Sequence, residues 1–381
     1  LENTTDHELG FQLIINENLI RTEYPQEGLK YVKKFSPQVR FDSSSGRRDL
    51  RDLDFVTIDG KTARDFDDAV CVIPDIESGG FRLFVAIADV AHYVRPKDPV
   101  DQEALIRGTS VYFPTHAVPM LPEELSNNLC SLRPNVNRLT LTCEMRIDRS
   151  GEVIGYSLSE SIIRSRARLI YEDVADLLDG RTSSISSPEL QANIRKMDKL
   201  AKILQRKRIK RGAVQFSFAE EVFEFDSDQQ MTGIGRSYQS SAMKLIEQFM
   251  LEANETVARH CVKNRIPALY RVHDLPDMRK LQKLQQTFFR FGVKTSLSTL
   301  ADPKKFNEVI EQIQELPHFE QLQVLLLRSM ALAVYQTTNK GHFGLAADYY
   351  AHFTSPIRRY PDLVVHRAIK EKLHLDKGVK S

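Results

Sequence analysis

The sequence predicts an α/β (α+β) fold with one large domain, residues 51–381, which follows a short N-terminal lead-in, residues 1–50. Two observations predict this fold class. Residues from about 53 to 165 have the apolar content and the alternation that are typical of β-strands. The second half carries apolar residues at three-to-four spacing, which is typical of helices packed on a core. The sequence has no internal repeats and no low-complexity tracts, so one large domain is the simplest arrangement.

The lead-in begins with a predicted helix. Phe11–Ile20 has helix-like spacing, and Tyr24-Pro25 ends it because proline disfavours helix continuation. Residues 43–48, Ser-Ser-Ser-Gly-Arg-Arg, are predicted to form a polar linker. The first 50 residues bury too little apolar surface to fold alone, so we expect them to dock on the domain that follows.

The segments of the large domain are predicted from their periodicity. Phe81–Ala88 and Leu139–Ile147 are predicted strands. Residues 148–151, Asp-Arg-Ser-Gly, form a hairpin-type turn into a further strand over residues 153–163. The second half is predicted to contain one strand, Phe216–Phe225, and four helices: Leu190–Lys210, Ser241–Lys263, Met278–Phe291 and Leu322–Tyr335.

The composition excludes several classes of protein. Lys plus Arg number 53 against 51 for Asp plus Glu, and this balance neither requires nor excludes nucleic acid. The four cysteines lack CxxC spacing, which argues against zinc ribbons and disulfide frameworks. The chain has no apolar run near about 18 residues and no P-loop or Rossmann glycine pattern. We therefore expect a cytoplasmic protein with no membrane span and no nucleotide cofactor.

An acidic segment between two apolar runs is the strongest chemical signal. Asp59, Asp65, Asp67 and Asp68 lie within ten positions, and predicted buried strands flank them on both sides. Carboxylates forced together at the edge of a core repel each other unless a cation joins them. Oxygen ligands suit hard ions, so the segment predicts a Mg²⁺ site, with Mn²⁺ as a substitute, for phosphoryl chemistry. The alternative is a solvated acidic loop.

A second polar segment lies near the C-terminal end. Residues 354–356, Thr-Ser-Pro, are typical of a helix start, which would place Arg358 and Arg359 in the first helical turn. Cations are disfavoured there, so the arginines require an anion: a phosphate, or alternatively an acidic residue of the core. Pro361 is then expected to kink or interrupt the helix.

Aromatic and basic residues leave two interpretations open. The rings of Tyr112, Tyr171 and Phe216 either stack on nucleobases or pack in the core. The basic run at residues 206–211, followed by Gly212, suits a helix C-terminus; it is either solvated or follows a phosphate backbone.

Nine segments together resemble the ribonuclease II/ribonuclease R (RNB) family of exoribonucleases. The resemblance runs from about residue 50 to residue 372, and Phe66 and Tyr360-Pro361 follow ribonuclease R more closely than ribonuclease II. The matching segments occur in the family's order: residues 52–60, 63–69, 85–90, 108–114, 119–126, 128–132, 341–345, 350–363 and 366–369.

The resemblance implies a curled mixed β-sheet surrounded by helices, with a channel that leads to a buried acidic site. It also implies Mg²⁺-dependent, processive 3′→5′ hydrolysis of single-stranded RNA to nucleoside 5′-monophosphates. Asp59, Asp65, Asp67 and Asp68 match the metal-binding and catalytic set, and Asp67 matches the position where Asn is expected to abolish activity.

The resemblance assigns further residues to RNA. Arg358 matches an arginine that supports the transition state, and Arg359 beside it is expected to contact RNA. Tyr112 and Phe216 match two rings between which the 3′-terminal bases stack. Tyr171 matches a tyrosine that influences the length of the end product. Glu247 matches a glutamate near the terminal ribose, where a contact with the 2′-OH would distinguish RNA from DNA.

The family's usual arrangement has OB-fold domains on both sides of the catalytic domain. We therefore expect this chain to be a catalytic-domain fragment without flanking OB-folds, and a monomer. Two other functions remain open from the sequence. One is a catalytically inactive module that binds single-stranded RNA, and the other is a metal-dependent exonuclease that acts on DNA.

Overall fold

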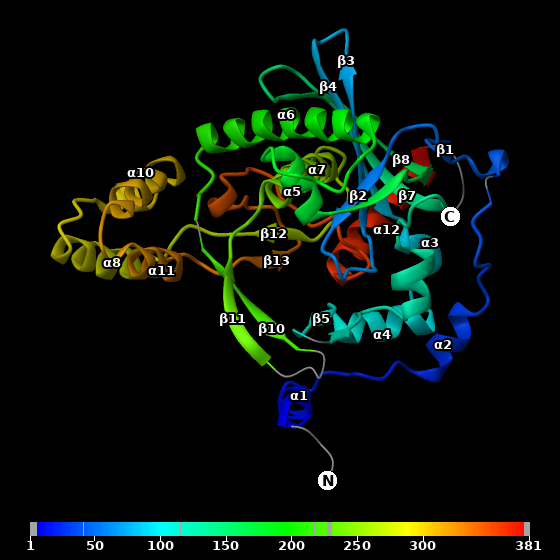
Figure 1. Ribbon diagram of the computed structural model, residues 1–381, viewed down its shortest axis with the longest axis horizontal. Helices are drawn as coiled ribbons and strands as arrows, with labels where there is room; N and C mark the ends of the chain where they lie inside the picture. Colours follow the sequence, from blue (N-terminus) through cyan, green and yellow to red (C-terminus); the bar gives the residue numbers. More distant parts are fainter. Residues whose placement is uncertain (1–5, 41, 115, 217, 227–230, 377–381) are drawn as a thin grey trace.

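A seven-stranded mixed sheet forms the centre of the computed structural model, which describes residues 6–40, 42–114, 116–216, 218–226 and 231–376 (Figure 1). The strand order is β1-β8-β7-β4-β3-β2-β9. The five inner strands β8, β7, β4, β3 and β2 pair antiparallel, whereas the edge strands β1 and β9 join the sheet in parallel. The strands are β1 (Arg48–Asp49), β2 (Val56–Asp59), β3 (Asp68–Asp75), β4 (Gly80–Ala88), β7 (Asn137–Ile147), β8 (Val153–Arg164) and β9 (Ala167–Ile170).

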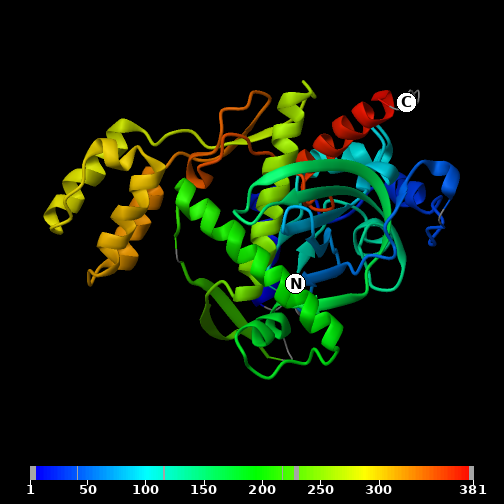
Figure 2. The same cartoon turned by 90° about the horizontal axis from the view of Figure 1, so that it is seen from above.

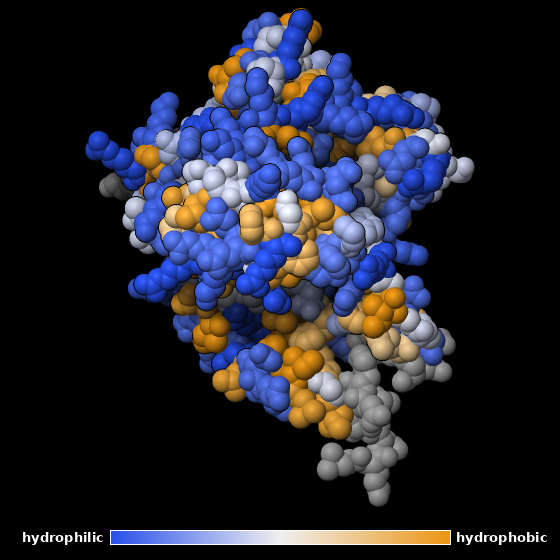
Figure 3. All heavy atoms as spheres, turned by 90° about the vertical axis from the view of Figure 1, so that its left-hand side faces the viewer, coloured by the Kyte–Doolittle hydropathy of each residue, from blue (hydrophilic) through white to orange (hydrophobic). Residues whose placement is uncertain are grey.

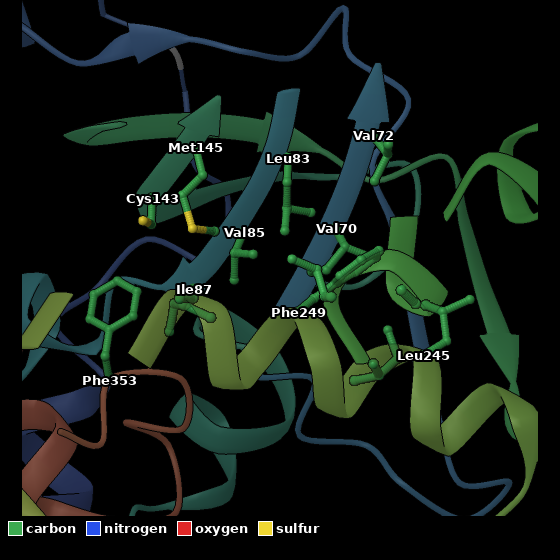
Figure 4. Packing of buried hydrophobic residues seen from close by; sticks show 14 of the residues in the cluster. Val70, Val72, Leu83, Val85, Ile87, Cys143, Met145, Leu245, Phe249 and Phe353 are labelled. Atoms are coloured by element: carbon green, nitrogen blue, oxygen red, sulfur yellow. The ribbon is translucent and has the colours of Figure 1, made fainter. Parts of the chain in front are cut away.

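Both faces of the sheet are covered, which explains why its strands are apolar almost throughout. Successive side chains point to opposite faces. Val70 and Val85 lie opposite each other and pack with Phe249 on one face, as Figure 4 shows. Ala69 and Phe84 belong to a second core on the other face. The first face is covered by α5 (Tyr171–Leu178), α6 (Pro188–Arg211) and α7 (Ser241–Lys263); the second packs against α2 (Gln26–Val32), α3 (Val90–Tyr93), α4 (Pro99–Arg107) and the π-helical turn η2 (Glu124–Leu129).

A group of helices projects from this body and has its own core, which includes Leu281, Phe288, Phe306 and Leu322 (Figures 1 and 2). Figure 3 views the molecule from this side and shows hydrophilic surface around smaller apolar areas. The projection comprises α8 (Met278–Arg290), α9 (Leu297–Leu300), α10 (Pro303–Gln314) and α11 (Phe319–Ser329). The chain enters it after strand β12 (Tyr270–Val272) and leaves it towards β13 (Val334–Gln336), and these two strands pair antiparallel.

The remaining elements are short or peripheral. Two small hairpins are formed by β5 with β6 and by β10 with β11. In the described part of the chain, no helix combines the length and the apolar composition needed to cross a bilayer. The short or peripheral elements are α1 (Asp6–Glu17), η1 (Ser43–Ser45), β5 (Val111–Tyr112), β6 (Ala117–Val118), β10 (Glu220–Phe225), β11 (Met231–Ser237), η3 (Phe343–Leu345) and α12 (Tyr360–Asp376).

The predicted fold class is confirmed, and so are most long segments. Helix α7 has the predicted bounds, and the Ser240 hydroxyl caps it by accepting a hydrogen bond from the Met243 amide. The helix predicted over Leu322–Tyr335 is wrong at both ends, because α11 runs from Phe319 to Ser329 and residues 334–336 are strand β13. Periodicity alone does not separate a short apolar strand from the end of a helix.

A buried ion network joins the lead-in, the sheet and the last helix. The fully buried Asp89 carboxylate is held by the Arg47 guanidinium at 2.6 Å and by the Lys370 ammonium at 2.7 Å. Both cations also approach Glu160 of β8, and His374 of α12 lies 2.7 Å from the same carboxylate. The paired cations hold the pKa of Asp89 far below its usual value despite its burial.

Replacing Lys370 tests this network. Lys370→Ala leaves Asp89 buried with one cation instead of two, so we expect it to lower the free energy of unfolding by about 3 kcal/mol. The exposed ion pair between Lys202 and Asp198 provides the control, because Lys202→Ala should change stability by no more than about 0.5 kcal/mol. Urea unfolding of both variants and the parent measures the two losses. If Lys370→Ala unfolds at the same urea concentration as Lys202→Ala, the buried network does not stabilise the fold.

Candidate active site

The four predicted aspartates line one cavity of about 420 Å³. Asp59 ends strand β2, Asp68 begins strand β3, and Asp65 and Asp67 lie in the loop between these strands. The opposite wall comes from α7 and from the segment at residues 350–359. Pairing in the sheet brings the two strand ends together, so the solvated-loop alternative does not describe this segment.

Asp67 is the most firmly held of the four. Its side chain is 5% exposed, and its Oδ1 accepts a hydrogen bond of 2.8 Å from the Ile357 amide. The Arg358 Nε lies 3.6 Å from Oδ2. Burial nevertheless raises the pKa of Asp67 well above its ordinary value, against the opposing effects of Arg358 and the Ile357 amide. Unless it is further compensated, the charged form of Asp67 is therefore costly in this cavity.

Asp59 and Asp68 carry the same electrostatic cost. Burial, with repulsion from Asp68 and Asp65, raises the pKa of Asp59 to about 8. Burial raises the pKa of Asp68 to about 6 against the attraction of Arg358. The two carboxylates therefore favour a proton or a cation as a neighbour.

The donor set suits a hard divalent cation by its chemistry. Oδ2 of Asp59 and Oδ2 of Asp67 are both buried and accept no hydrogen bond within the described chain. Carboxylate oxygens of this kind are the ligands that Mg²⁺ prefers. In their present positions, however, no three acidic, histidine or cysteine side chains of the described residues are close enough together to count as one cation site. The metal remains a prediction that rests on the ligand chemistry.

The arginine segment forms a turn rather than the predicted helix start. Residues 356–358 form the turn, and α12 begins only at Tyr360, so Arg358 and Arg359 precede the helix. The predicted kink at Pro361 is also wrong, because Pro361 lies in the first helical turn, where its missing N–H is tolerated. The carboxylate of Asp362 explains the difference, since it accepts a 2.8 Å hydrogen bond from the Ser355 amide and thereby stabilises the turn.

The two arginines have different partners. Arg359 binds Asp362 through two hydrogen bonds of 3.0 and 2.8 Å, so the alternative of an acidic core partner is correct for this residue. Arg358 donates to the Ser355 hydroxyl and lies beside Asp67, while its side chain remains 44% exposed. Arg358 is therefore the arginine that is better placed to meet a ligand in the cavity.

Tyr112 is an exposed ring on the small β5–β6 hairpin. Its side chain is 55% exposed, and its hydroxyl donates to Oδ2 of Asp65 at 3.1 Å. The hairpin is tied to the arginine turn because the Ser110 amide donates to the Arg358 carbonyl at 3.0 Å. On the outer side, the ring of Phe11 in α1 packs edge-on against Phe113 at 4.9 Å between centroids. The core-packing alternative for Tyr112 is thus disfavoured by its exposure.

The other predicted RNA contacts are only partly brought together. Tyr171 and Glu247 line the carboxylate cavity, and Glu247 is exposed on α7. Phe216 is not among the residues that line it. Its ring stacks on Phe218 at 5.5 Å and meets Phe306 edge-on at 6.3 Å, which is the packing alternative. The binding roles of these residues remain predictions.

Among the cavity-lining residues that were not predicted, two are joined by a hydrogen bond. Asn254 of α7 and Tyr350 both line the cavity, and the Asn254 amide donates to the Tyr350 hydroxyl at 3.2 Å. Asn254 also accepts a hydrogen bond of 2.9 Å from the Phe353 amide, so it holds the segment that leads to the arginine turn. A buried asparagine on the apolar face of α7 was the available signal.

The basic run ends α6 before Gly212 as predicted, and the solvated alternative is correct only for Arg206 and Lys210, which are exposed. Three of its members are paired with α7 instead of facing solvent or a phosphate chain. The bonds are Lys207 to Glu252 at 3.2 Å, Arg208 to Gln248 at 2.8 Å and Arg211 to Glu255 at 2.6 Å. They fix α6 on the helix that forms one wall of the cavity.

Comparisons with known proteins point to a single family. The RNB domain family model matches residues 47–375. Ribonuclease R of Escherichia coli (strain K12) is 43% identical over 356 residues, which cover 93% of this chain and 44% of the relative. The chain spans about half the length of the curated relatives it matches.

Solved structures give the same result. Mycoplasma genitalium RNase R in complex with ribose methylated single-stranded RNA matches with a TM-score of 0.92 and 33% identity, covering 100% of this chain and 59% of that chain. The same protein in complex with double-stranded RNA matches with a TM-score of 0.92 and 33% identity, covering 100% of this chain and 67% of that chain.

The raised carboxyl pKa values predict how stability depends on pH. When a chelator keeps divalent cations away, Asp59 and Asp68 bind protons more tightly in the folded state than in the unfolded state. The free energy of unfolding therefore falls as the pH rises from about 4 to about 8. Asp59→Asn removes the buried charge, and we expect it to be more stable than the parent at pH 8 by roughly 1–5 kcal/mol but nearly equal at pH 4, where the carboxyl is protonated in the folded state and half-protonated in the unfolded state. Urea unfolding in EDTA measures this, with exposed Asp52→Asn as the control.

Proposed function

The chain belongs to the RNB domain family, and from this premise we propose that it is a Mg²⁺-dependent 3′→5′ exoribonuclease. It hydrolyses single-stranded RNA processively and releases nucleoside 5′-monophosphates, and Mn²⁺ can replace Mg²⁺. The observation that carries this proposal is the buried Asp67, fixed by the Ile357 amide beside Arg358 in a cavity that three more aspartates share. The relative that was solved with single-stranded RNA supports the substrate class.

Substrate binding begins with the 3′-terminal nucleotides. The exposed ring of Tyr112 stands at the cavity and offers a stacking surface for a base, which contributes roughly 1–3 kcal/mol without sequence preference. Phe216 is the proposed second ring, and it must then leave its contact with Phe306. Tyr171 lines the same cavity and limits how far a strand advances. Glu247 accepts a hydrogen bond from a ribose 2′-OH, which distinguishes RNA from DNA.

The chemistry needs positive charge at a phosphodiester. A bound divalent cation supplies Lewis-acid polarisation of the phosphate and a water of lowered pKa. The chain itself supplies Arg358, whose partly exposed guanidinium donates to the phosphate oxygens as charge develops. Asp59, Asp65, Asp67 and Asp68 would hold the cation. Of these four, Asp67 and Asp68 are the proposed catalytic carboxylates. The Ile357 amide keeps Asp67 oriented.

Asp67→Asn tests the proposed catalysis. We expect the variant to cleave a 5′-labelled oligoribonucleotide at least about 100-fold more slowly in Mg²⁺, because it loses a charged oxygen at the reacting centre. Binding of the same oligonucleotide in EDTA should change less than threefold. The alternative function, an inactive RNA-binding module, predicts that the parent protein itself shortens no RNA in Mg²⁺.

Tyr112→Ala tests the stacking role. The variant should weaken binding of short oligonucleotides about 5-fold to 100-fold and change the length of the shortest residual fragment, with little effect on cleavage of long RNA. Tyr112→Phe keeps the ring and should resemble the parent in both assays. If Tyr112→Ala lowers the thermal midpoint and all activities together, Tyr112 acts through packing instead. Substrates with deoxyribose at the penultimate positions complete the test, because equal rates for RNA and DNA would favour a DNA-directed exonuclease.

A further inference from the structure

A row of aromatic side chains lies on one face of the small sheet made by β12 and β13. Arg271 lies directly opposite Tyr335 across the two strands. On its other edge, β12 meets residues 350–351, since Tyr270 bridges Ala351 and the Arg271 amide donates to the Tyr350 carbonyl at 3.0 Å. Directly opposed residues share a face of a sheet, and His352 lies two positions after Tyr350, so all four side chains lie on the same face.

The contacts between these side chains form a continuous path. The Arg271 guanidinium lies over the Tyr335 ring, 4.8 Å from its centroid. The Tyr335 hydroxyl and Nδ1 of His352 form a hydrogen bond of 2.6 Å, with ring centroids 5.5 Å apart. The His352 ring then meets Tyr350 edge-on at 5.7 Å.

The two ends of this row have different surroundings. Tyr350 is 6% exposed and lines the carboxylate cavity. Tyr335, at the other end, is 37% exposed. The row therefore runs from the site proposed for the scissile phosphate to the surface, and nothing in the chemistry proposed above uses its outer end.

The charges around the outer end are mostly positive. Arg271, Arg358 and Arg359 all act electrostatically on both Tyr335 and His352. The acidic group that acts on Tyr335 is Asp362, and Arg359 already pairs with it. Burial and these cations lower the pKa of His352 to about 3, so its ring is neutral and the positive charge is that of the arginines. A polyanion is the ligand that such a surface attracts.

We propose that Tyr335, backed by Arg271, is a further base-stacking site, separate from Tyr112 and Phe216, for an RNA strand whose 3′ end occupies the carboxylate cavity. This inference rests on the proposed function only in taking single-stranded RNA as the ligand. Arg271 covers one face of the ring and leaves the other for a nucleobase. The hydrogen bond to His352 fixes the ring before RNA arrives, so little side-chain freedom is lost on binding. Arg271 supplies positive charge for the phosphates on either side of the stacked base.

The test measures binding without cleavage. Fluorescence anisotropy in EDTA compares labelled oligouridylates of two to ten nucleotides for the parent, Tyr335→Ala and Tyr335→Phe. We expect Tyr335→Ala to bind the longest strands about 5-fold to 50-fold more weakly and the dinucleotide equally well, because a dinucleotide fills only the cavity. Tyr335→Phe should lose less than threefold at every length. Leu332→Ala, an 87% exposed residue three positions earlier, is the matched control and should bind as the parent does.

Two outcomes overturn the inference: Tyr335→Ala binds the longest strands as tightly as the parent, or it loses the same factor for the dinucleotide. Tyr335→Leu guards against misfolding, since it keeps apolar volume without an aromatic face and should behave as Tyr335→Ala. Cleavage in Mg²⁺ is measured separately. A parent protein that shows the predicted length dependence but shortens no RNA refutes the proposed hydrolysis and leaves this stacking site supported.

Discussion

The hydrogen bond from the Ile357 amide to the Asp67 carboxylate is the interaction on which the rest of the site depends. It joins residues that are 290 positions apart and places Arg358 beside a carboxylate that is almost fully buried. Asp362 holds the same turn from the other side, through Ser355 and Arg359. The carbonyl of Arg358 in turn accepts the Ser110 amide, so the hairpin that bears Tyr112 takes its position from the same turn.

The sheet explains why such an arrangement is stable. Both faces of β3 and β4 are covered by apolar cores, so the end of β2 and the start of β3 are rigidly placed. Four carboxylates then meet at one edge, where burial raises the pKa values of three of them. Interactions elsewhere in the fold must offset this electrostatic cost. Other buried carboxylates carry less of this cost, because each has a cation beside it: Asp89 pairs with Lys370, and Glu252 and Glu255 of α7 pair with basic residues of α6.

Much of this could be predicted from the sequence, and the failures have physical reasons. The aspartates were identifiable because an acidic run between two buried strands has few explanations. Helix α7 was identifiable because its capping residue and its apolar periodicity indicate the same start. The helix start near Pro356 was wrong because a tertiary contact, the bond from Ser355 to Asp362, outweighed a local signal. Phe216 matched a family position, but its partner Phe306 lies 90 residues later, on a helix whose contacts no local pattern predicts. Asn254 is one of several buried polar residues of α7, and periodicity does not distinguish it from the others.

The separation between Asp67 and Ile357 also has a consequence for biosynthesis. Ribosomes add roughly 5–20 residues per second, so the amide that orients Asp67 is made roughly 15–60 seconds after the carboxylate. During translation the acidic loop therefore exists without the turn that completes it. The reaction centre can be completed only after the turn at residues 356–358 has been made, so a premature stop codon between residues 171 and 357 allows every strand of the sheet to be translated but removes the turn that orients Asp67.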